Sequence, residues 1–316
     1  MNRGINYEIE GNDNRSMVLG YHEAQRLGLP FRNHNKTAHN VDLTHLPSKD
    51  RANIVADENG EFESRFMIGF EVEKNSFHRR AVTELALFSH YERDSSCGVE
   101  AVTNLLPLIG KSTWRNKVFN MFSEAKYVVE DCYSPSDRRC GGHVTLSVQG
   151  MNGEQLSDAL RPFSAILYSL YKFRLRNSYC SSNIFMDIDE DDWVVFHRKY
   201  QVCKIMHDRV EFRLLNRVKS VSDMNLRYRL MYELVDFAVN NPNGTYASFL
   251  RRVKPIIVMM YDGDVAKADE VMQLSKSFRK MLMTRKINRD VVDFVDRHRQ
   301  CTRYYTASLR RELRNS

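Results

Sequence analysis

The chain has 316 residues, with 47 Lys and Arg against 40 Asp and Glu, and 42% of its residues are hydrophobic. This composition is typical of a globular protein and argues against wholesale disorder. The longest apolar run, residues 255–261, is far too short to span a bilayer, and the first 30 residues lack the apolar core of a signal peptide. We therefore expect a folded cytoplasmic protein without a membrane partner.

The chain begins with a polar segment, residues 1–64, punctuated by Gly, Asn and Asp. It contains one short helical pattern at 21–27, which ends at a glycine and a proline. We interpret 1–64 as an N-terminal extension that could act as a lid over a site. Apolar runs begin at residue 65.

The first apolar run, 66–73, predicts a strand whose alternation places Glu71 and Glu73 on the same face. A helical pattern follows over 76–90, then a turn over 94–98 and a strand over 99–103 that contains Glu100. A second helix is predicted over 111–125.

The next strand, 141–148, carries His143 on a polar face and Val144 on an apolar face. Helical spacing predicts a long helix over 157–176. Residues 204–215 predict a single strand with Glu211 and Arg213 opposite apolar side chains. The remaining helical patterns cover 222–240 and the stretch from 264 to the end.

The predicted strands all present charged or polar groups on the face opposite their apolar side chains. Neighbouring antiparallel strands bring such groups together, and repelling carboxylates then need a counter-charge. Carboxylate oxygens at this density suit Mg²⁺ or Mn²⁺, which bind them together with substrate phosphates. The pattern therefore predicts a phosphorylated nucleotide at a metal site. Arg213 would neutralise phosphoryl charge there, and His143 would hydrogen-bond a phosphate or acyl-phosphate oxygen.

Several short segments share their order and rough spacing with the motifs of one family. They are Ile68-Gly-Phe-Glu-Val-Glu73, Asp94-Ser-Ser-Cys-Gly-Val-Glu100, Cys140-Gly-Gly-His-Val144, Arg174-Leu-Arg-Asn-Ser-Tyr-Cys180 and Val210-Glu-Phe-Arg213. Together they resemble the amidoligase family of phages and bacterial gene clusters, which is related to glutamate-cysteine ligase and glutamine synthetase. The resemblance covers about residues 65–240.

This resemblance implies an α+β fold, with a curved antiparallel sheet of the glutamine synthetase type flanked by helices and followed by a helical C-terminal region. It implies an amidoligase catalytic core over 65–240, and the helical pattern and basic residues beyond it predict a basic helical region over 241–316 that packs on this core. The implied reaction joins a carboxylate to an amine through an acyl phosphate, with ATP and Mg²⁺ or Mn²⁺ as cofactors. The implied substrates are a small-molecule or peptide carboxylate and an amine. The implied location is the cytoplasm, which would be the host cytoplasm if a phage encodes the chain.

The resemblance also implies roles for individual residues. The expected metal ligands are Glu71, Glu73, Glu100 and Glu211. The expected catalytic residues are Glu71, Glu73, His143 and Arg213, and the expected nucleotide contacts are His143, Arg213 and Arg176. Asp94 is a candidate contact to metal or to the incoming amine.

Other interpretations remain open for several features. Basic residues crowd between 276 and 314, which would suit a non-catalytic nucleic-acid-binding or virion-associated protein that retains the ligase fold. No nucleic-acid motif accompanies them, so a solvated helical face or a contact in a homo-oligomer is the commoner explanation, and we do not expect nucleic acid as the partner. Gly141 and Gly142 suit either the start of a strand after a loop or a close approach to phosphate.

The six cysteines show no CxxC pair and no regular spacing, which favours reduced thiols. Buried inert thiols are the commoner explanation of Cys97, Cys140 and Cys180. A zinc site built on Cys140 and His143 would need two more ligands, and the sequence offers none at a suitable spacing. The acidic stretch 187–192 is best explained as a solvated loop.

Overall fold

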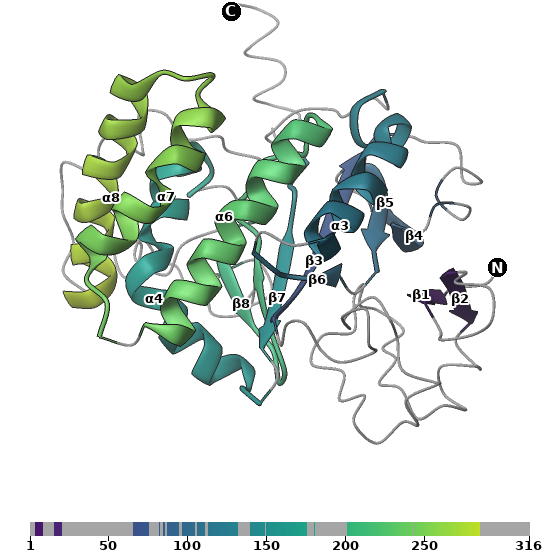
Figure 1. Cartoon of the computed structure of the whole chain (residues 1–316), viewed down its shortest axis with the longest axis horizontal. Helices are drawn as coiled ribbons and strands as arrows, with labels where there is room; N and C mark the ends of the chain where they lie inside the picture. Colours follow the sequence, from purple (N-terminus) through teal and green to yellow (C-terminus); the bar gives the residue numbers. More distant parts are fainter. Residues whose placement is uncertain are drawn as a thin grey trace, which may run out of the picture.

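The computed structural model describes the backbones of two N-terminal strands and most of the chain between residues 66 and 284 (Figure 1). The described residues are 4–8, 16–20, 66–75, 82, 85, 87–94, 97–104, 106–110, 113–131, 140–148, 150–175, 180, 201–241 and 243–284. Among them no helix is both long and apolar enough to cross a membrane. The short helical pattern at 21–27 and the acidic stretch 187–192 lie outside these ranges.

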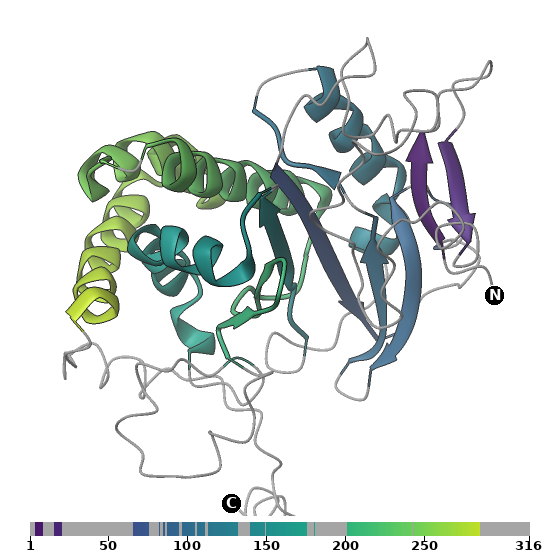
Figure 2. The ribbon, with the colours of Figure 1, turned by 90° about the horizontal axis from the view of Figure 1, so that it is seen from below.

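A seven-stranded antiparallel sheet forms the centre of the described structure, so the fold is α+β (Figures 1 and 2). Its order is β4-β5-β3-β7-β9-β8, and β6 pairs with β3 beside this path. The strands are β3 (Phe66–Lys74), β4 (Phe88–Asp94), β5 (Gly98–Thr103), β6 (Leu106–Pro107), β7 (Val144–Val148), β8 (Cys203–Ile205) and β9 (Val210–Phe212). The long strand β3 is central, because β5 pairs with one of its edges and β7 with the other.

A separate antiparallel hairpin is formed by β1 (Gly4–Glu8) and β2 (Ser16–Gly20). It lies beside β4 (Figure 2). Sequence analysis expected no strands in the polar segment 1–64, so this hairpin is an addition to the prediction.

Helices cover the apolar face of the sheet (Figures 1 and 2). They are α3 (Thr113–Glu124), α4 (Gly153–Leu170) and α6 (Val221–Asn240), whereas α7 (Tyr246–Met260) and α8 (Val265–Thr284) pack on other helices. The ring of Phe70 on β3 meets the ring of Phe122 on α3 edge to face, with 5.7 Å between centroids. Tyr228 on α6 donates a hydrogen bond to Pro107 O at 2.5 Å and accepts one from Ile109 N at 2.9 Å. These contacts attach α3 and α6 to the strands beneath them.

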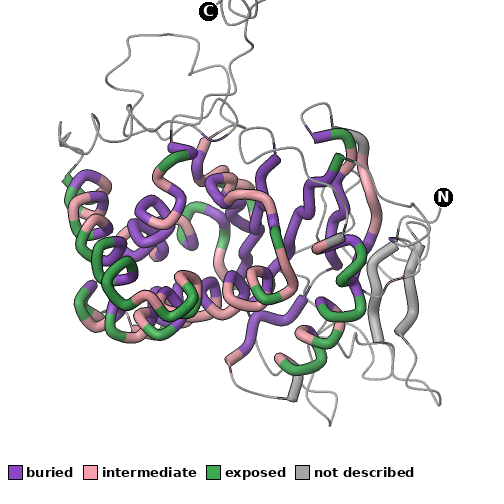
Figure 3. The backbone as a smooth tube through the Cα atoms, turned by 90° about the horizontal axis from the view of Figure 1, so that it is seen from above, coloured by how far each residue is buried: buried purple, intermediate pink, exposed green. Residues whose placement is uncertain are grey.

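The last two described helices pack on α4 and α6. Ser169 on α4 donates a hydrogen bond to Val271 O on α8 at 2.7 Å, and Phe249 on α7 contacts the rings of Phe163 and Phe237. One continuous apolar core therefore extends from Phe66 to Met281. Figure 3 shows the strands of the main sheet buried along most of their length, while the outer turns of α7 and α8 are exposed.

Two predicted elements are wrong in part, and one helix had no predicted bounds. The helix predicted over 76–90 overlaps β4, because residues 88–90 pair with β5 in an antiparallel ladder. The strand predicted over 204–215 is a hairpin: Met206 N donates to Arg209 O at 2.9 Å, which closes a turn between β8 and β9. Helix α7 lies within the region 241–316 that was predicted to be helical, although no bounds were predicted for it; its interior proline, Pro255, opposes a helix.

The other predicted helices are confirmed with shifted ends. Helix α4 begins at Gly153 rather than at 157, because Asn152 caps its first turn in a reciprocal pair with Gln155. It ends at Leu170, and a short 3₁₀ turn, Lys172–Arg174, follows. The helix predicted from 264 onward is described as α8 as far as Thr284, and the rest of that prediction lies outside the described residues.

Candidate functional site

Four glutamates lie on the face of the sheet opposite the helices. Glu73 on β3 is the direct cross-strand partner of Glu100 on β5. Glu71, two residues earlier, faces the same way, and its backbone N–H donates to His143 O at 3.0 Å. On the other side of His143, Thr145 of β7 pairs with Glu211 of β9. The four carboxylates, which are contributed by Glu71, Glu73, Glu100 and Glu211, are only 2–4% exposed.

His143 lies between these carboxylates. Its Nδ1 donates to Glu71 Oε2 at 2.5 Å and lies 3.8 Å from Glu211 Oε1, while its Nε2 lies 3.4 Å from Glu73 Oε1. An imidazole in contact with three carboxylates is held in one orientation. It therefore lies at the centre of the group, where it can hydrogen-bond a carboxylate or a ligand.

Arg213 supplies permanent positive charge at the β9 side. Its Nη1 donates to Glu211 Oε1. Burial alone would lower the pKa of Arg213, but the Glu211, Glu71, Glu73 and Glu100 carboxylates outweigh that effect and raise it. The guanidinium is thus charged at every physiological pH. Lys204 on β8 adds a second cation, with Nζ 3.9 Å from Glu211 Oε2.

A second arginine, Arg174, approaches the site from the 3₁₀ turn after α4. It is buried and donates through Nη1 to Cys140 O at 2.9 Å. A Cβ added at Gly141 would lie 2.8 Å from His143 Nε2 and 3.2 Å from Arg174 Nη2, so the side chains of His143 and Arg174 flank this glycine. The Gly141 N–H itself donates to Glu73 Oε2 at 2.6 Å.

The two glycines before β7 have different neighbours. A Cβ at Gly142 would lie 2.4 Å from Asn216 O, so close contact with the neighbouring backbone accounts for this glycine. Gly141 also forms an isolated bridge with Asn216. Both contacts support the interpretation of these glycines as the start of the strand. They do not test an approach to phosphate.

Three groups of side chains have donor atoms close enough to hold one metal ion. Within each group one ligand atom per residue lies within 4.8 Å of the others. Among the described residues the groups are Glu71, Glu73 and Glu100; Glu71, His143 and Glu211; and Glu73, Cys97 and Cys140. The first offers only carboxylate oxygens, whereas the third offers two thiols. The site therefore combines hard and soft donors on either side of Glu73.

The structure brings six of the predicted site residues together. These are Glu71, Glu73, Glu100, His143, Glu211 and Arg213. Asp94 ends β4, where it pairs with Gly98 at the backbone, and its side chain is outside the described part. Arg176 also lies outside the described residues.

Sequence analysis did not assign Arg174, Lys204 or the pair Cys97 and Cys140 to the site. Arg174 could have been predicted, because it is the first residue of one of the segments that carry the resemblance and is only two residues before Arg176. Cys97 and Cys140 also lie in segments that carry the resemblance, but no local pattern indicated that they meet Glu73 or that Lys204 meets Glu211, since these contacts arise from strand pairing.

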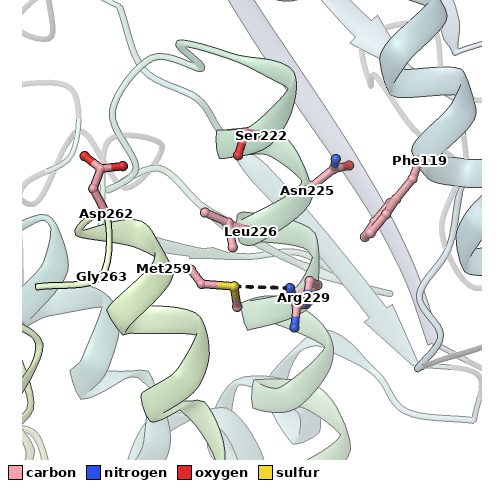
Figure 4. A pocket seen from close by; sticks show the side chains of 8 residues that line it. All are labelled: Phe119, Ser222, Asn225, Leu226, Arg229, Met259, Asp262 and Gly263. Atoms are coloured by element: carbon pink, nitrogen blue, oxygen red, sulfur yellow. Dashed lines mark hydrogen bonds between the residues drawn. The ribbon is translucent and has the colours of Figure 1, made fainter. Parts of the chain in front are cut away.

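A separate hollow lies on the helical side of the protein, with a volume of about 450 Å³ (Figure 4). Phe119 of α3, Asn225 and Arg229 of α6 and Met259 of α7 contribute to its lining, and Arg229 contacts the Met259 sulfur at 3.8 Å. It contains none of the predicted site residues. On the neighbouring basic helix α8, Lys267 pairs with Asp264.

Comparison with known proteins gives no assignment. No model of a known protein family matches the chain. No curated protein matches its sequence either.

Proposed function

We propose that this protein is an ATP- and Mg²⁺-dependent ligase that joins a carboxylate to an amine, on a sheet of the glutamine synthetase type. The observation that carries the proposal is the group formed by Glu71, Glu73 and Glu100, three buried carboxylates on two adjacent strands with ligand oxygens within 4.8 Å. Buried like charges at this distance repel one another strongly. A bound divalent cation removes that repulsion.

The donor set fits the proposed cofactors. Mg²⁺ and Mn²⁺ prefer carboxylate oxygens and take substrate phosphates as additional ligands. Glu71, Glu73 and Glu100 would hold the ion, and Glu211, which lies near His143, would extend the set. ATP would supply the phosphoryl group that activates the carboxylate substrate.

The cationic side chains are arranged to receive negatively charged groups. Arg213 donates to Glu211 and Arg174 donates to Cys140 O, while His143 links Glu71 to Glu73. Guanidinium groups bind phosphate oxygens through paired N–H donors, and a buried guanidinium binds them more strongly than an exposed one. Arg213 and Arg174 would therefore orient the nucleotide phosphates, and His143 would hydrogen-bond one of their oxygens. Arg176 and Asp94 remain predicted contacts.

On this proposal the partners are a small-molecule or peptide carboxylate and an amine, encountered in the cytoplasm. Catalysis would come mainly from positioning the two substrates and from neutralising charge. The described residues that contact the carboxylates are suited to both tasks, because buried side chains held by several contacts lose little freedom when a ligand arrives.

Calorimetry of ATP binding tests the proposal directly. The wild type should bind ATP with Mg²⁺ present and not without it, and Glu71→Gln or Arg213→Ala should weaken binding by at least about tenfold, or ~1.4 kcal/mol. Glu124→Gln, at an exposed position on α3, is the matched control and should bind as the wild type does.

A folded wild type that ignores ATP in the presence of Mg²⁺ would contradict the ligase proposal. In that case binding of single-stranded or double-stranded DNA should be measured across a salt series. Affinity that falls steeply with salt would favour the nucleic-acid-binding alternative.

A further inference from the structure

Two thiols and one carboxylate converge beside the carboxylate group. Cys97 directly precedes β5, Cys140 precedes the bridge that leads into β7, and Glu73 is near the end of β3. One ligand atom from each lies within 4.8 Å of the other two. All three residues are buried, with exposures of 2% for Cys97, 0% for Cys140 and 4% for Glu73.

Backbone contacts hold the segment before β7 against Glu73. The Gly141 N–H donates to Glu73 Oε2 at 2.6 Å, and Arg174 donates to Cys140 O at 2.9 Å. Cys140 is therefore fixed on both sides, by the hydrogen bond of its neighbour and by that of its own carbonyl group. Its side chain is also fully buried, which restricts the rotamers open to the thiol.

The turn before β5 is held equally closely. Gly98, next to Cys97, has φ +114°, and a Cβ added there would lie 2.5 Å from Asn75 O. Only glycine permits this conformation and this approach without strain. The turn that carries Cys97 is thus packed on the chain that leaves β3, two residues after Glu73.

We propose that Cys97, Cys140 and Glu73 form a binding site for a thiophilic divalent cation of the Zn²⁺ class. Thiolate sulfur selects such ions over Mg²⁺, which requires oxygen ligands, whereas a single carboxylate suits both. On binding, each thiol loses its proton to solvent and two metal–sulfur bonds form. The ion then balances two thiolates and one carboxylate, with the Arg174 guanidinium beside Cys140 offsetting the remaining negative charge.

Zn²⁺ in proteins is usually tetrahedral and takes four ligands. The shell would be completed by solvent or by His143, whose Nε2 lies 3.4 Å from Glu73 Oε1. A carboxylate on the far nitrogen commonly orients a metal-binding imidazole, and Glu71 holds that position on His143 Nδ1. The strands thus supply the ligands beyond Cys140 and His143 that their sequence spacing lacked.

This site is distinct from the proposed Mg²⁺ site, although Glu73 belongs to both. It would fasten the turn before β5 and the segment before β7 to the end of β3. Its existence does not depend on ligase activity, and the two proposals can fail separately.

Titration with Co²⁺, as a spectroscopic substitute for Zn²⁺, tests the site on the full chain kept reduced with a phosphine. The wild type should bind one equivalent with a near-ultraviolet thiolate-to-cobalt band, and added Zn²⁺ should abolish the band. Cys97→Ala and Cys140→Ala should each lose most of the band. Cys203→Ala, which changes a thiol on β8, and Glu100→Gln, which removes only a Mg²⁺ ligand, should retain it.

A reduced, folded wild type without a thiolate band would overturn the proposal, and so would an undiminished band in the Cys97→Ala/Cys140→Ala double variant. Thermal melting gives a second measurement that does not depend on the variants. Zn²⁺ should raise the melting temperature of the wild type, because a ligand that binds only the folded state stabilises it. Loss of ATP binding in Glu100→Gln with the cobalt band intact would show that Glu100 serves the Mg²⁺ site and not the thiolate site.

Discussion

Glu73 on β3 stands directly opposite Glu100 on β5, and both carboxylates are buried. Like charges directly opposite on neighbouring strands destabilise a sheet. A bound cation compensates the repulsion between such carboxylates, so the pair lowers the stability of the metal-free protein but serves a binding function. The metal-free protein should therefore be less stable than its fold allows.

Glu100→Gln should consequently stabilise the protein in the presence of a chelator. We expect a gain of ~1 kcal/mol in the free energy of unfolding, because the substitution removes one of two repelling charges while keeping its shape. The same variant should lose the stabilisation that Mg²⁺ gives the wild type. Urea denaturation with and without Mg²⁺ measures both effects, and a destabilised Glu100→Gln in chelator would contradict the charge-repulsion argument.

The side chains of His143 and Glu71, whose Nδ1 and Oε2 atoms lie 2.5 Å apart, should be strongly coupled in their contributions to stability. A double-mutant cycle with His143→Ala and Glu71→Ala isolates this interaction. We expect a coupling energy of about 2 kcal/mol, since removing the imidazole leaves the buried Glu71 carboxylate without its hydrogen-bond donor. Additive single effects would mean that the two side chains act independently.

Arg213 should stabilise the fold by an amount that does not vary across the neutral range. Neighbouring carboxylates raise its pKa, so its stabilising charge is fully present below the ordinary arginine pKa and is lost only at a still higher pH. Arg213→Met should cost about 3 kcal/mol or more, because Glu211 then remains buried without this counter-charge. Urea denaturation at about pH 6 and at about pH 9 should show the same decrease in the free energy of unfolding of Arg213→Met relative to the wild type. Arg251→Ala, at an exposed position on α7, serves as the control.

Tyr171 should make the fold sensitive to alkali. Burial, partly offset by Arg227, raises the pKa of Tyr171 from 10.0 to about 12. The neutral phenol is favoured in the folded state, so its contribution is present below pH 10 and is lost as the pH rises towards 12. Over that pH interval the free energy of unfolding of Tyr171→Phe should therefore fall by about 2 kcal/mol less than that of the wild type.

Denaturation at about pH 9 and about pH 12 checks the Tyr171 prediction. The control is Tyr127→Phe, whose side chain is 48% exposed. If the free energy of unfolding falls equally in the wild type and in Tyr171→Phe between these pH values, another group governs alkaline unfolding.

The local alternation along the strands could be predicted from the sequence. Side chains on a strand point to opposite faces with a period of two, so the shared face of Glu71 and Glu73, and that of Glu211 and Arg213, follows from spacing alone. The amphipathic helices α3 and α6 were predicted for a similar reason. The capping residue Asn152 is visible in the sequence as well, but the prediction relied on apolar spacing alone and therefore placed the start of α4 too late.

Strand order and register required the tertiary structure. The pairing of Glu73 with Glu100, the position of His143 beside Glu71 and the approach of Arg174 join residues far apart in the chain. Residues 88–90 have helical spacing but form a strand, because the free edge of β5 offers them backbone hydrogen bonds. Helix α7 forms despite Pro255, since packing of its apolar face outweighs the lost hydrogen bond.

By itself the sequence determined which side chains share a strand face, because the period of a strand is a property of the local backbone. It thereby placed carboxylates, a histidine and an arginine on the polar sides of separate strands. Only the tertiary structure decided which strands are neighbours, and so which donors meet around Glu73. Convergence of Cys97 and Cys140 on that carboxylate is a product of long-range pairing, which leaves no periodic signal in the chain.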